Sequence, residues 1–514
     1  MTQLARQVYV ISDLHLGGVY PDPDVPGDRG FRICTHADAV AAFIRSLADR
    51  PASAPPAELV INGDVVDFLA ERHSHGPEWR PFNAEPDVAV ALLRAIVDRD
   101  RVVFDAMAAH LAAGHRLVIL LGNHDVEMAL PQVRAALVEE LDAGGKDFTF
   151  IHDGEAYVVG DALIEHGNEY DRWNRVNYAQ LRRIRADLSR FRTDHLDFFE
   201  PPAGSLMVAD VINPIKENYR FVDLLKPQNG AAIPMLLALE PGLRPLIGKA
   251  AKFAATAQEL AARRKAANAM GADISASGDD DGPMGGDMGG MGGMGGMGGM
   301  SAPTAPPDDE VTRELEAVLG GEADAFHEAL QVGAEVEQEV VGSDISAMGT
   351  ARLLVGGLRL LLTRGDGSTE AVRRRFPALL QALRSNQDST AFDRGTESGA
   401  EYWDAAKELA QGPIKHVVFG HTHLPKRVEL PSGGYYLNSG TWADVLRFPD
   451  QVIEGSHDEQ MTALQGFVDA LRSNDFSDYT LFRPTYVRLD VGPDGTVAEA
   501  ALCDYDPDAP TEAP

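Results

Sequence analysis

Five short motifs built from metal-ligating residue types recur along this chain, and each follows a short apolar run. Together they offer carboxylate, amide and imidazole side chains, which are common ligands of divalent metals. A fold that gathers the ends of these runs at one edge would concentrate the side chains in one pocket, suited to two divalent cations and to the hydrolysis of phosphate esters. The motifs are Asp13-Leu14-His15, Gly63-Asp64-Val65-Val66-Asp67, Gly122-Asn123-His124-Asp125, Glu165-His166-Gly167 and Gly420-His421-Thr422-His423.

Two of the motifs place a histidine two residues after another ligand. We expect Asp13 and His15 to point the same way, because side chains at i and i+2 of an extended segment share a face. One carboxylate and one imidazole can then bind the same cation. His421 and His423 repeat this spacing, and Gly420 before them is expected to permit the tight turn of a ligand loop.

The remaining motifs also begin where apolar runs end. Asp64 follows the second run, and its two carboxylate oxygens could bridge two metals, with Gly63 as the turn residue. Asn123 follows the third run, and His166 ends a predicted hairpin. Strand ends are where α/β sheets usually place ligand sites. Gly-Asn-His-Asp alone could be a turn, but the common order and placement of all five motifs make coincidence an inadequate explanation.

The elements that must position these motifs alternate between strand and helix in the first part of the chain. Such alternation indicates parallel pairing and an α/β sheet. Strands are predicted over 8–12, 59–62 and 117–121, and helices over 37–49, 87–113 and 131–142.

A second, mixed sheet stacked on the first is predicted from later strand-like runs. Residues 156–159 and 162–165 are typical of a hairpin with a tight turn at 160–161. We expect the late strands to join this second sheet. They are 416–419, 435–438, 485–490 and 496–502.

The segment 171–412 is too long for a loop in a compact domain, so we predict an inserted, mainly helical unit. It divides the core into a first part, 1–170, and a second part, 413–505. A disordered tail is expected at 506–514. The insertion begins with an Arg-rich, helix-compatible stretch at 173–199.

One part of the insertion has low complexity. Gly and Met repeat within 271–309, and because nothing there can bury a core, we predict disorder. A Met-rich copper site is the alternative, since thioethers are soft ligands. The apolar stretch at 356–364 is expected to be an ordinary buried helix, with contact to a membrane surface as the alternative.

Bulk composition restricts the classes of function. The chain has 514 residues and a formal net charge of -32, which disfavours nucleic acid as a partner because its binding uses clustered Lys and Arg. No run approaches the roughly 18 apolar residues of a membrane span, and the run at 8–12 leads into Asp13 without a cleavage site, so we expect no signal peptide. Cys34 and Cys503 make no disulfide framework, and a cytoplasmic location is expected.

The motif set resembles that of the calcineurin-like metallophosphoesterase superfamily, over residues 7–170 and 413–445 and the closing strands. The resemblance implies a two-sheet α/β/β/α sandwich that holds two divalent ions, with Mn²⁺, Fe²⁺, Zn²⁺ and Co²⁺ all open. It implies that His124 is catalytic and that Asp67 orients it; for Asp67 a helix N-cap is the alternative. The implied ligands are Asp13, His15, Asp64 and His423 for the first ion, and Asp64, Asn123, His166 and His421 for the second.

The implied reaction is hydrolysis of a phosphomonoester, phosphodiester or pyrophosphate by direct attack of a hydroxide that bridges the ions. Phe68 stands where protein phosphatases of the superfamily carry Arg, so we expect a phosphorylated small molecule as substrate. The pattern is also similar to bacterial UDP-2,3-diacylglucosamine pyrophosphatases, which makes a lipid-linked nucleotide pyrophosphate the alternative substrate. A non-catalytic scaffold and a nuclease are the alternatives from other classes.

The insertion leaves the core after His166 and returns before His421. Both of its roots are therefore expected beside the metals, and we expect it to cap the active site and select the substrate. The candidate phosphate contacts near its first root are Asn168, Arg172, Asn174 and Arg175.

Overall fold

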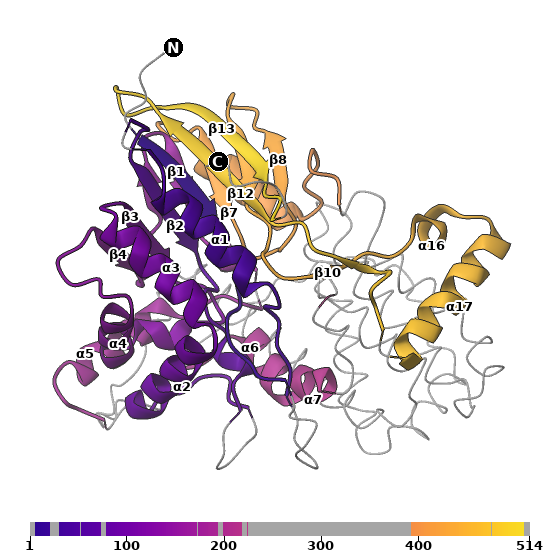
Figure 1. The fold of residues 1–514 in the computed structure, drawn as a ribbon, viewed down its shortest axis with the longest axis horizontal. Helices are drawn as coiled ribbons and strands as arrows, with labels where there is room; N and C mark the ends of the chain where they lie inside the picture. Colours follow the sequence, from indigo (N-terminus) through magenta and orange to yellow (C-terminus); the bar gives the residue numbers. More distant parts are fainter. Residues whose placement is uncertain are drawn as a thin grey trace, which may run out of the picture.

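Figure 1 shows the protein as a computed structural model. Several predictions fall outside the residues that the structure describes, namely those for 271–309, 356–364, Arg172 and most of the tail. The structure describes residues 6–20, 30–51, 53–72, 79–171, 173–193, 199–217, 224, 392–473 and 475–507.

The first sheet contains six strands in the order β13-β12-β1-β2-β3-β4. β1 to β4 are parallel to one another, and β12 is antiparallel to both β1 and β13. Every residue of β2 is buried, as expected for a parallel strand covered on both faces. The strands are β1 (Arg6–Ile11), β2 (Ala57–Asn62), β3 (Arg116–Leu120), β4 (Phe148–Ile151), β12 (Thr485–Val491) and β13 (Val497–Asp504).

The second sheet contains five strands in the order β5-β6-β7-β9-β8. β1 shows how the two sheets share a core, because its alternate side chains point to opposite faces. Val8 and Val10 cluster with Leu437 of the second sheet, whereas Tyr9 and Ile11 join the core beneath the helices. The strands are β5 (Tyr157–Val159), β6 (Ala162–Ile164), β7 (His416–Phe419), β8 (Lys426–Glu429) and β9 (Tyr435–Asn438).

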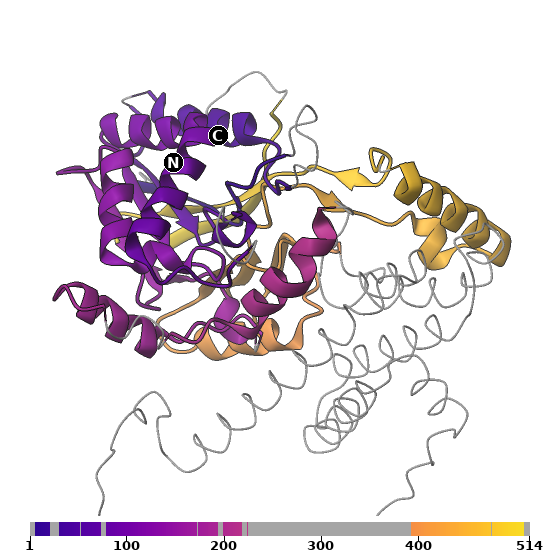
Figure 2. The same cartoon turned by 90° about the horizontal axis from the view of Figure 1, so that it is seen from below.

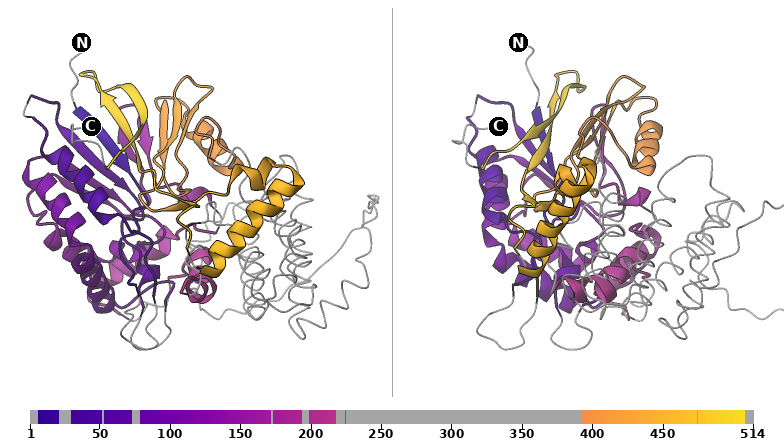
Figure 3. Two further views of the ribbon diagram at one scale, coloured as in Figure 1. Left: turned by 45° about the vertical axis from the view of Figure 1, so that its right-hand side comes forward. Right: turned by 90° about the vertical axis from the view of Figure 1, so that its right-hand side faces the viewer.

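Helices cover the outer face of each sheet and complete four layers (Figure 3). On the second sheet, α15 (Ala400–Leu409) packs Tyr402 and Ala406 against Phe419 and Tyr436. The predicted α/β/β/α sandwich is confirmed, while its large insertion falls mostly outside the described residues. The helices that share the core of the first sheet are α1 (Ala37–Ala48), α2 (Pro86–Arg99), α3 (Arg101–Ala112), α4 (Pro131–Glu140) and α5 (Tyr178–Leu188).

The single helix predicted over 87–113 is wrong, because α2 ends and α3 begins at Asp100. The backbone there has φ −107° and ψ 29°. The buried Asp100 carboxylate accepts a hydrogen bond from the Gly17 N–H at 2.9 Å and pairs with Arg32. These partners lie far away in sequence, so the break has no local signal.

The placement of the closing strands in the second sheet is also wrong. β12 pairs with β1, from Arg6 opposite Val491 to Val10 opposite Val487, and β13 pairs with β12. The edge of β1 that faces away from β2 offers unpaired backbone groups. The closing hairpin covers this edge and so extends the first sheet.

A helical arm between β9 and β12 was not predicted. It leaves and rejoins the sandwich through the two-stranded sheet of β10 (Val445–Leu446) and β11 (Thr480–Leu481). Figure 1 shows its helices, α16 (Asp450–Glu454) and α17 (His457–Ser473), to one side of the sandwich. Among the described helices, none has the length and apolar character needed to cross a membrane.

The described beginning of the predicted insertion packs against the sandwich. Leu181 and Ile184 of α5 lie in the core beneath the first sheet's helices. Beyond α5 come α6 (Ala203–Met207), a π-helical turn η5 (Val208–Ile212) and α7 (Asn213–Lys216), on the side toward which the carboxyl ends of β1 to β3 point (Figures 1 and 2). The domain boundaries at 170 and 413 stay predictions.

Candidate dimetal centre

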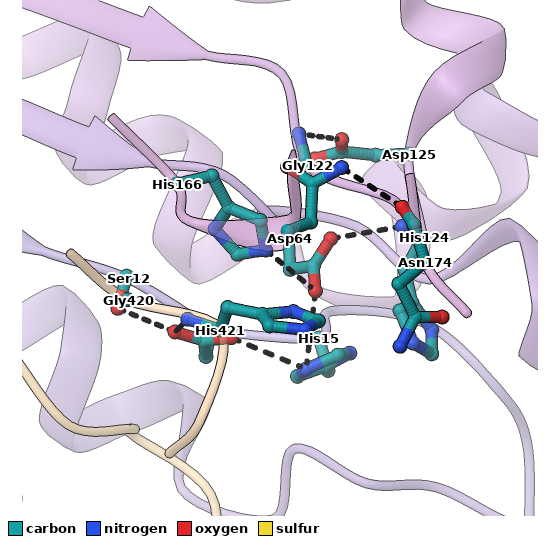
Figure 4. A network of polar contacts seen from close by, with 12 residues as sticks. Ser12, His15, Asp64, Gly122, His124, Asp125, His166, Asn174, Gly420 and His421 are labelled. Carbon is teal, nitrogen blue, oxygen red and sulfur yellow. Dashed lines mark hydrogen bonds and ion pairs between the residues drawn. The ribbon is translucent and has the colours of Figure 1, made fainter. Parts of the chain in front are cut away.

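The predicted ligands follow strands of both sheets at one edge of the sandwich. β1, β2 and β3 end two or three residues before Asp13, Asp64 and Asn123, and β6 and β7 end two residues before His166 and His421. The carboxyl ends of these parallel strands meet at one edge, so side chains from distant parts of the chain converge there (Figure 4).

The backbone is left-handed at five of the predicted ligands. This conformation costs an L residue roughly 1–2 kcal/mol, and it persists where the surrounding structure holds it. Asp13 and His15 do bring their ligand atoms together as predicted, but the expectation that an extended segment does this is wrong. The φ values are 54° at Asp13, 47° at His15, 51° at Asp64, 66° at His421 and 62° at His423.

Glycines of the motifs give the ligand side chains room. Gly63 has φ 80°, and a Cβ there would lie 2.3 Å from Nδ1 of His166. Gly420, in contrast, has no positive φ, and the tight turn expected after it forms across His421, where the Thr422 N–H donates to the Gly420 carbonyl oxygen at 2.7 Å. A Cβ at Gly420 would lie 2.5 Å from the Ser12 hydroxyl and 2.8 Å from Oδ2 of Asp13, so its role is steric.

Asp13, His15 and His423 form one cluster of buried ligand atoms. Nε2 of His423 lies 3.1 Å from Nε2 of His15 and 3.3 Å from Oδ1 of Asp13. The other Asp13 oxygen, Oδ2, accepts from the Ser12 hydroxyl at 2.5 Å and from the His421 N–H at 3.0 Å. Oδ1 is thereby left facing the two imidazoles, in the arrangement that a shared cation would hold.

Asp64 joins this cluster to a second one that contains His166 and His421. Oδ2 of Asp64 lies 3.2 Å from Nε2 of His166 and 3.8 Å from Nε2 of His15. Its Oδ1 accepts the backbone N–H of His124 at 2.9 Å. The expectation that both carboxylate oxygens bridge the metals needs correction, because Oδ2 alone faces both clusters.

Several buried polar atoms at this edge have no hydrogen-bond partner within the described part of the chain. Three of them belong to predicted ligands and are Oδ1 of Asp13, Oδ1 of Asn123 and Nε2 of His166. Leaving such an atom buried and unsatisfied costs roughly 1–3 kcal/mol. All three belong to predicted ligands, so this set of oxygen and nitrogen donors fits divalent cations, without selecting one metal.

The second ring nitrogens of two histidines are already engaged. Nδ1 of His166 donates to the carbonyl oxygen of Asn62 at 2.7 Å, and Nδ1 of His15 lies 3.2 Å from Oδ2 of Asp67. Hydrogen bonds of this kind fix the tautomer of a ligating histidine and raise its basicity. In both residues Nε2 is left to face the cluster.

Asp171 is a contact that the sequence analysis missed. Its Oδ2 lies 3.2 Å from Nε2 of His421 and accepts from Asn174 Nδ2 at 2.7 Å, while Oδ1 accepts from the Trp173 N–H at 2.9 Å. The only signal in the sequence is an acidic residue five positions after His166, which is too common a feature to single out.

Asp125 connects two of the ligand loops. Its Oδ1 accepts from the Gly122 N–H at 2.7 Å and its Oδ2 from the Val65 N–H at 2.8 Å. The loops that carry Asn123 and Asp64 are thereby held together. Burial and, next, the charge of Asp64 raise the pKa of Asp125 to about 7.

His124 and Asp67 are in contact, with Nδ1 3.2 Å from Oδ2. Oδ1 of Asp67 accepts from the Ala70 N–H at 3.2 Å and so caps the short helix η1 (Phe68–Ala70). The geometry thus accommodates both alternatives for Asp67, the orienting acid and the cap. The part of His124 in turnover stays a prediction.

The charges at the centre depend on one another. Burial opposes ionisation of Asp64 and Asp67, but the imidazoles, His166 beside Asp64 and His124 beside Asp67, hold the pKa of both carboxyls well below the usual range. Burial likewise opposes protonation of His166, yet the charge of Asp64 raises its pKa to about 10. The carboxylates therefore favour positive charge here, which bound cations can supply in place of protons.

The candidate phosphate contacts have different surroundings. Asn168 and Arg175 donate to backbone carbonyls of the turn that they share, at 2.9 and 2.8 Å. Asn174 lies at the rim of the network, on the side of His124 (Figure 4). Arg172 is outside the described residues. Contact of any of them with substrate stays a prediction.

Lys216, at the end of α7, is a buried cation that sequence reasoning missed. It is 2% exposed, and its Nζ lies 5.0 Å from the ring centroid of Phe31. Burial and the charge of Lys216 oppose protonation of His124, although the neighbouring carboxylates outweigh them and raise the His124 pKa. Lys216 therefore lies within electrostatic reach of the predicted catalytic histidine, and no motif marks it.

Residues 6–225 match the family model described as calcineurin-like phosphoesterase. This part of the chain belongs to that family. The family supports a metal-dependent phosphoester hydrolase as the class of the protein. The match includes four of the five motifs and extends through α7, whereas the Gly420–His423 motif lies beyond it and is brought to the centre by the fold. No curated protein and no solved structure matches the chain.

Proposed function

We propose that the protein is a dimetal phosphoesterase that hydrolyses a phosphorylated small molecule. One observation carries the proposal, the position of Oδ2 of Asp64 between Nε2 of His166 at 3.2 Å and Nε2 of His15 at 3.8 Å. A carboxylate oxygen shared by two ligand clusters would hold two cations side by side, as two-metal phosphoester hydrolysis requires.

The residues around Asp64 would form two sets of metal ligands and a pair, His124 and Asp67, that acts on the substrate. When bound, the two cations would lower the pKa of a water at the centre and neutralise charge on the phosphate oxygens. His124 would stabilise the charge that develops or give a proton to the leaving oxygen, and Asp67 would set its tautomer. Asp13, His15 and His423 would complete one ligand set, and Asn123, His166 and His421 the other.

A small substrate suits the site better than a phosphoprotein. Phe68 is fully buried in the core beneath the helices of the first sheet, so its position cannot present a guanidinium to a phosphate. We infer that Lys216 supplies positive charge toward the substrate instead. It comes from the segment that follows the first insertion root, which supports the proposal that this segment caps the active site.

The test measures hydrolysis of p-nitrophenyl phosphate, bis(p-nitrophenyl) phosphate and a nucleoside diphosphate sugar by the full-length protein with Mn²⁺. Substitution His124→Ala is expected to lower the rate at least about 100-fold while the metal content stays unchanged. His457→Ala, an exposed histidine at the start of α17, is the matched control and should keep full activity.

The outcomes separate the alternatives. Cleavage of the diphosphate sugar above the two nitrophenyl esters would favour the lipid-linked pyrophosphatase alternative. A metal-loaded wild-type protein that cleaves none of the three would favour a scaffold. If His124→Ala matched the wild type in both rate and metal content, the part given to His124 would be wrong.

A further inference from the structure

Two arginines and a histidine meet outside the metal centre, between α4, α5 and the turn after β4. The guanidinium groups of Arg134 and Arg185 both contact Nε2 of His152, the latter at 2.5 Å. Nδ1 of His152 lies 3.0 Å from the carbonyl oxygen of Phe150. Because a carbonyl oxygen only accepts, Nδ1 carries the proton and Nε2 has a single lone pair. Two guanidiniums therefore compete for one lone pair, and Arg185 also donates to the His152 carbonyl oxygen, at 3.4 Å.

These arginines lack the acidic partners that are common elsewhere in this chain. Within the described residues, no carboxylate forms an ion pair with Arg134 or Arg185, whereas Arg94 of the same helix layer pairs with Glu139 at 2.9 Å. Asp153 acts on Arg185 electrostatically without forming an ion pair. Nε of Arg185 is buried and has no hydrogen-bond partner in the described ranges of the chain. The cluster thus holds donors and positive charge in excess of its acceptors.

The electrostatics agree with this geometry. Burial lowers the pKa of both Arg134 and Arg185, and the positive charge of Arg134 lowers that of Arg185 further. An anion between the two groups would offset both effects, because charge-assisted hydrogen bonds to guanidinium are about twice as strong as neutral ones.

We propose that Arg134, His152 and Arg185 form a binding site for a small oxyanion of the phosphate class. Planar guanidinium groups present forked N–H donors that match the oxygens of phosphate. The His152 imidazole adds a group that can become a second donor beside a dianion, since neighbouring charge readily shifts its protonation.

The site lies beside the metal edge but shares no residue with it. His152 directly follows β4, and the Leu121 N–H donates to the Ile151 carbonyl at 3.0 Å, just before the loop that carries Asn123. The site therefore begins about one strand spacing, roughly 5 Å, from β3, the strand that precedes the Asn123 loop. At this position the oxyanion is either free phosphate or a second phosphoryl group of the substrate.

The test is calorimetric titration of inorganic phosphate into the full-length Asp64→Ala variant, in which the proposed metal centre cannot compete for the anion. Binding is expected to persist in this variant. Adding Arg134→Gln and Arg185→Gln together should weaken it at least tenfold. The matched control is Arg190→Gln, an exposed arginine just after α5 whose guanidinium meets Asp187 and a backbone carbonyl, and it should leave binding unchanged.

Two results would overturn the proposal: no phosphate binding by folded Asp64→Ala protein, or equal binding with and without the paired glutamine substitutions. If the glutamine variant fails to fold, as judged by circular dichroism, Arg185→Lys replaces it. Lysine keeps the charge and loses the fork, so binding should weaken, and unchanged binding would again contradict the site.

The same substitutions in the otherwise wild-type enzyme distinguish free phosphate from a phosphoryl group of the substrate. This second experiment rests on the proposed function. If the site takes a phosphoryl group of the substrate, KM for a nucleoside diphosphate sugar rises and KM for p-nitrophenyl phosphate does not. If it takes free phosphate, neither KM changes and only the phosphate affinity falls. Both results support the site, whereas failure of the proposed function would remove all turnover without affecting the titration.

Discussion

Oδ2 of Asp171 lies 3.2 Å from Nε2 of His421, although 250 positions separate the two residues. Asp171 belongs to the turn after His166, and His421 to the loop after β7. Because the carboxylate engages Nε2, Nδ1 is the nitrogen of His421 that is left for a metal. The contact connects the start of the predicted insertion to the candidate metal centre and orients His421, one of the predicted ligands.

Substitution Asp171→Asn should weaken metal binding at the cluster of His421. Loss of a carboxylate that orients a ligating histidine typically costs 10–100-fold in metal affinity or activity, and we expect a loss of about that size. The measurement is the Mn²⁺ concentration that half-saturates activity. Asp142→Asn, which changes an exposed carboxylate, is the control. Identical Mn²⁺ dependence in the Asp171 variant and the control would contradict the orienting role.

Gly122→Ala should disturb the shared carboxylate directly. A Cβ at this position would lie 2.1 Å from Oδ1 of Asp64, a contact that cannot be accommodated without movement. We expect loss of metal and activity, with a stability cost of about 1–3 kcal/mol for overpacking. Metal content and chemical denaturation measure the two effects. Gly144→Ala, where an added Cβ meets nothing within 4 Å, is the control and should behave as wild type.

The sequence was sufficient for the fold class and for the motif side chains that meet, because both depend on local patterns. Apolar runs mark the strands, and ligand types after them mark the edge at which parallel strands end. Asp13, Asp64 and His166 are accordingly brought together as expected, and their binding of metal stays a prediction.

What the sequence did not reveal depends on partners far away along the chain. The break at Asp100 needs Gly17 and Arg32, and β12 reaches β1 only by long-range pairing. The left-handed backbone at the ligands is an unfavourable local conformation that tertiary contacts impose. The backbone preferences of these residue types therefore do not predict the left-handed conformation.

Lys216→Gln should raise KM for p-nitrophenyl phosphate about tenfold while kcat falls less and metal content is kept, since a charge toward phosphate acts mainly in binding. Lys216→Arg should restore part of the affinity because it keeps the charge. The control Lys407→Gln changes a half-buried lysine of α15 that pairs with Asp404. A fall in kcat alone, with no rescue by Arg, would indicate a structural role instead.

Glu127 should make stability depend on pH. Its Oε1 accepts from the backbone and side-chain nitrogens of Asn83 at 2.8 and 3.0 Å. Burial nevertheless raises its pKa to about 7 from an ordinary value of 4.5. The folded state therefore binds the proton more tightly than the unfolded state. The resulting stability is complete below pH 4.5 and is lost as the pH rises toward 7.

Glu127→Gln keeps the acceptor and removes the titration. Its free energy of unfolding should fall less than that of the wild type between about pH 5 and pH 8, by up to about 3 kcal/mol. Urea denaturation at both pH values measures this difference. The same dependence on pH in both proteins would show that Glu127 does not titrate as the fold implies.

The most direct test of the shared carboxylate is the metal content of Asp64→Ala beside His423→Ala. His423 belongs to one ligand cluster, whereas Oδ2 of Asp64 faces both. Elemental analysis of folded, Mn²⁺-loaded protein should find two ions in the wild type, one in His423→Ala and none retained in Asp64→Ala. An Asp64→Ala protein that keeps both ions, or keeps one as His423→Ala does, would contradict a centre built on one shared oxygen.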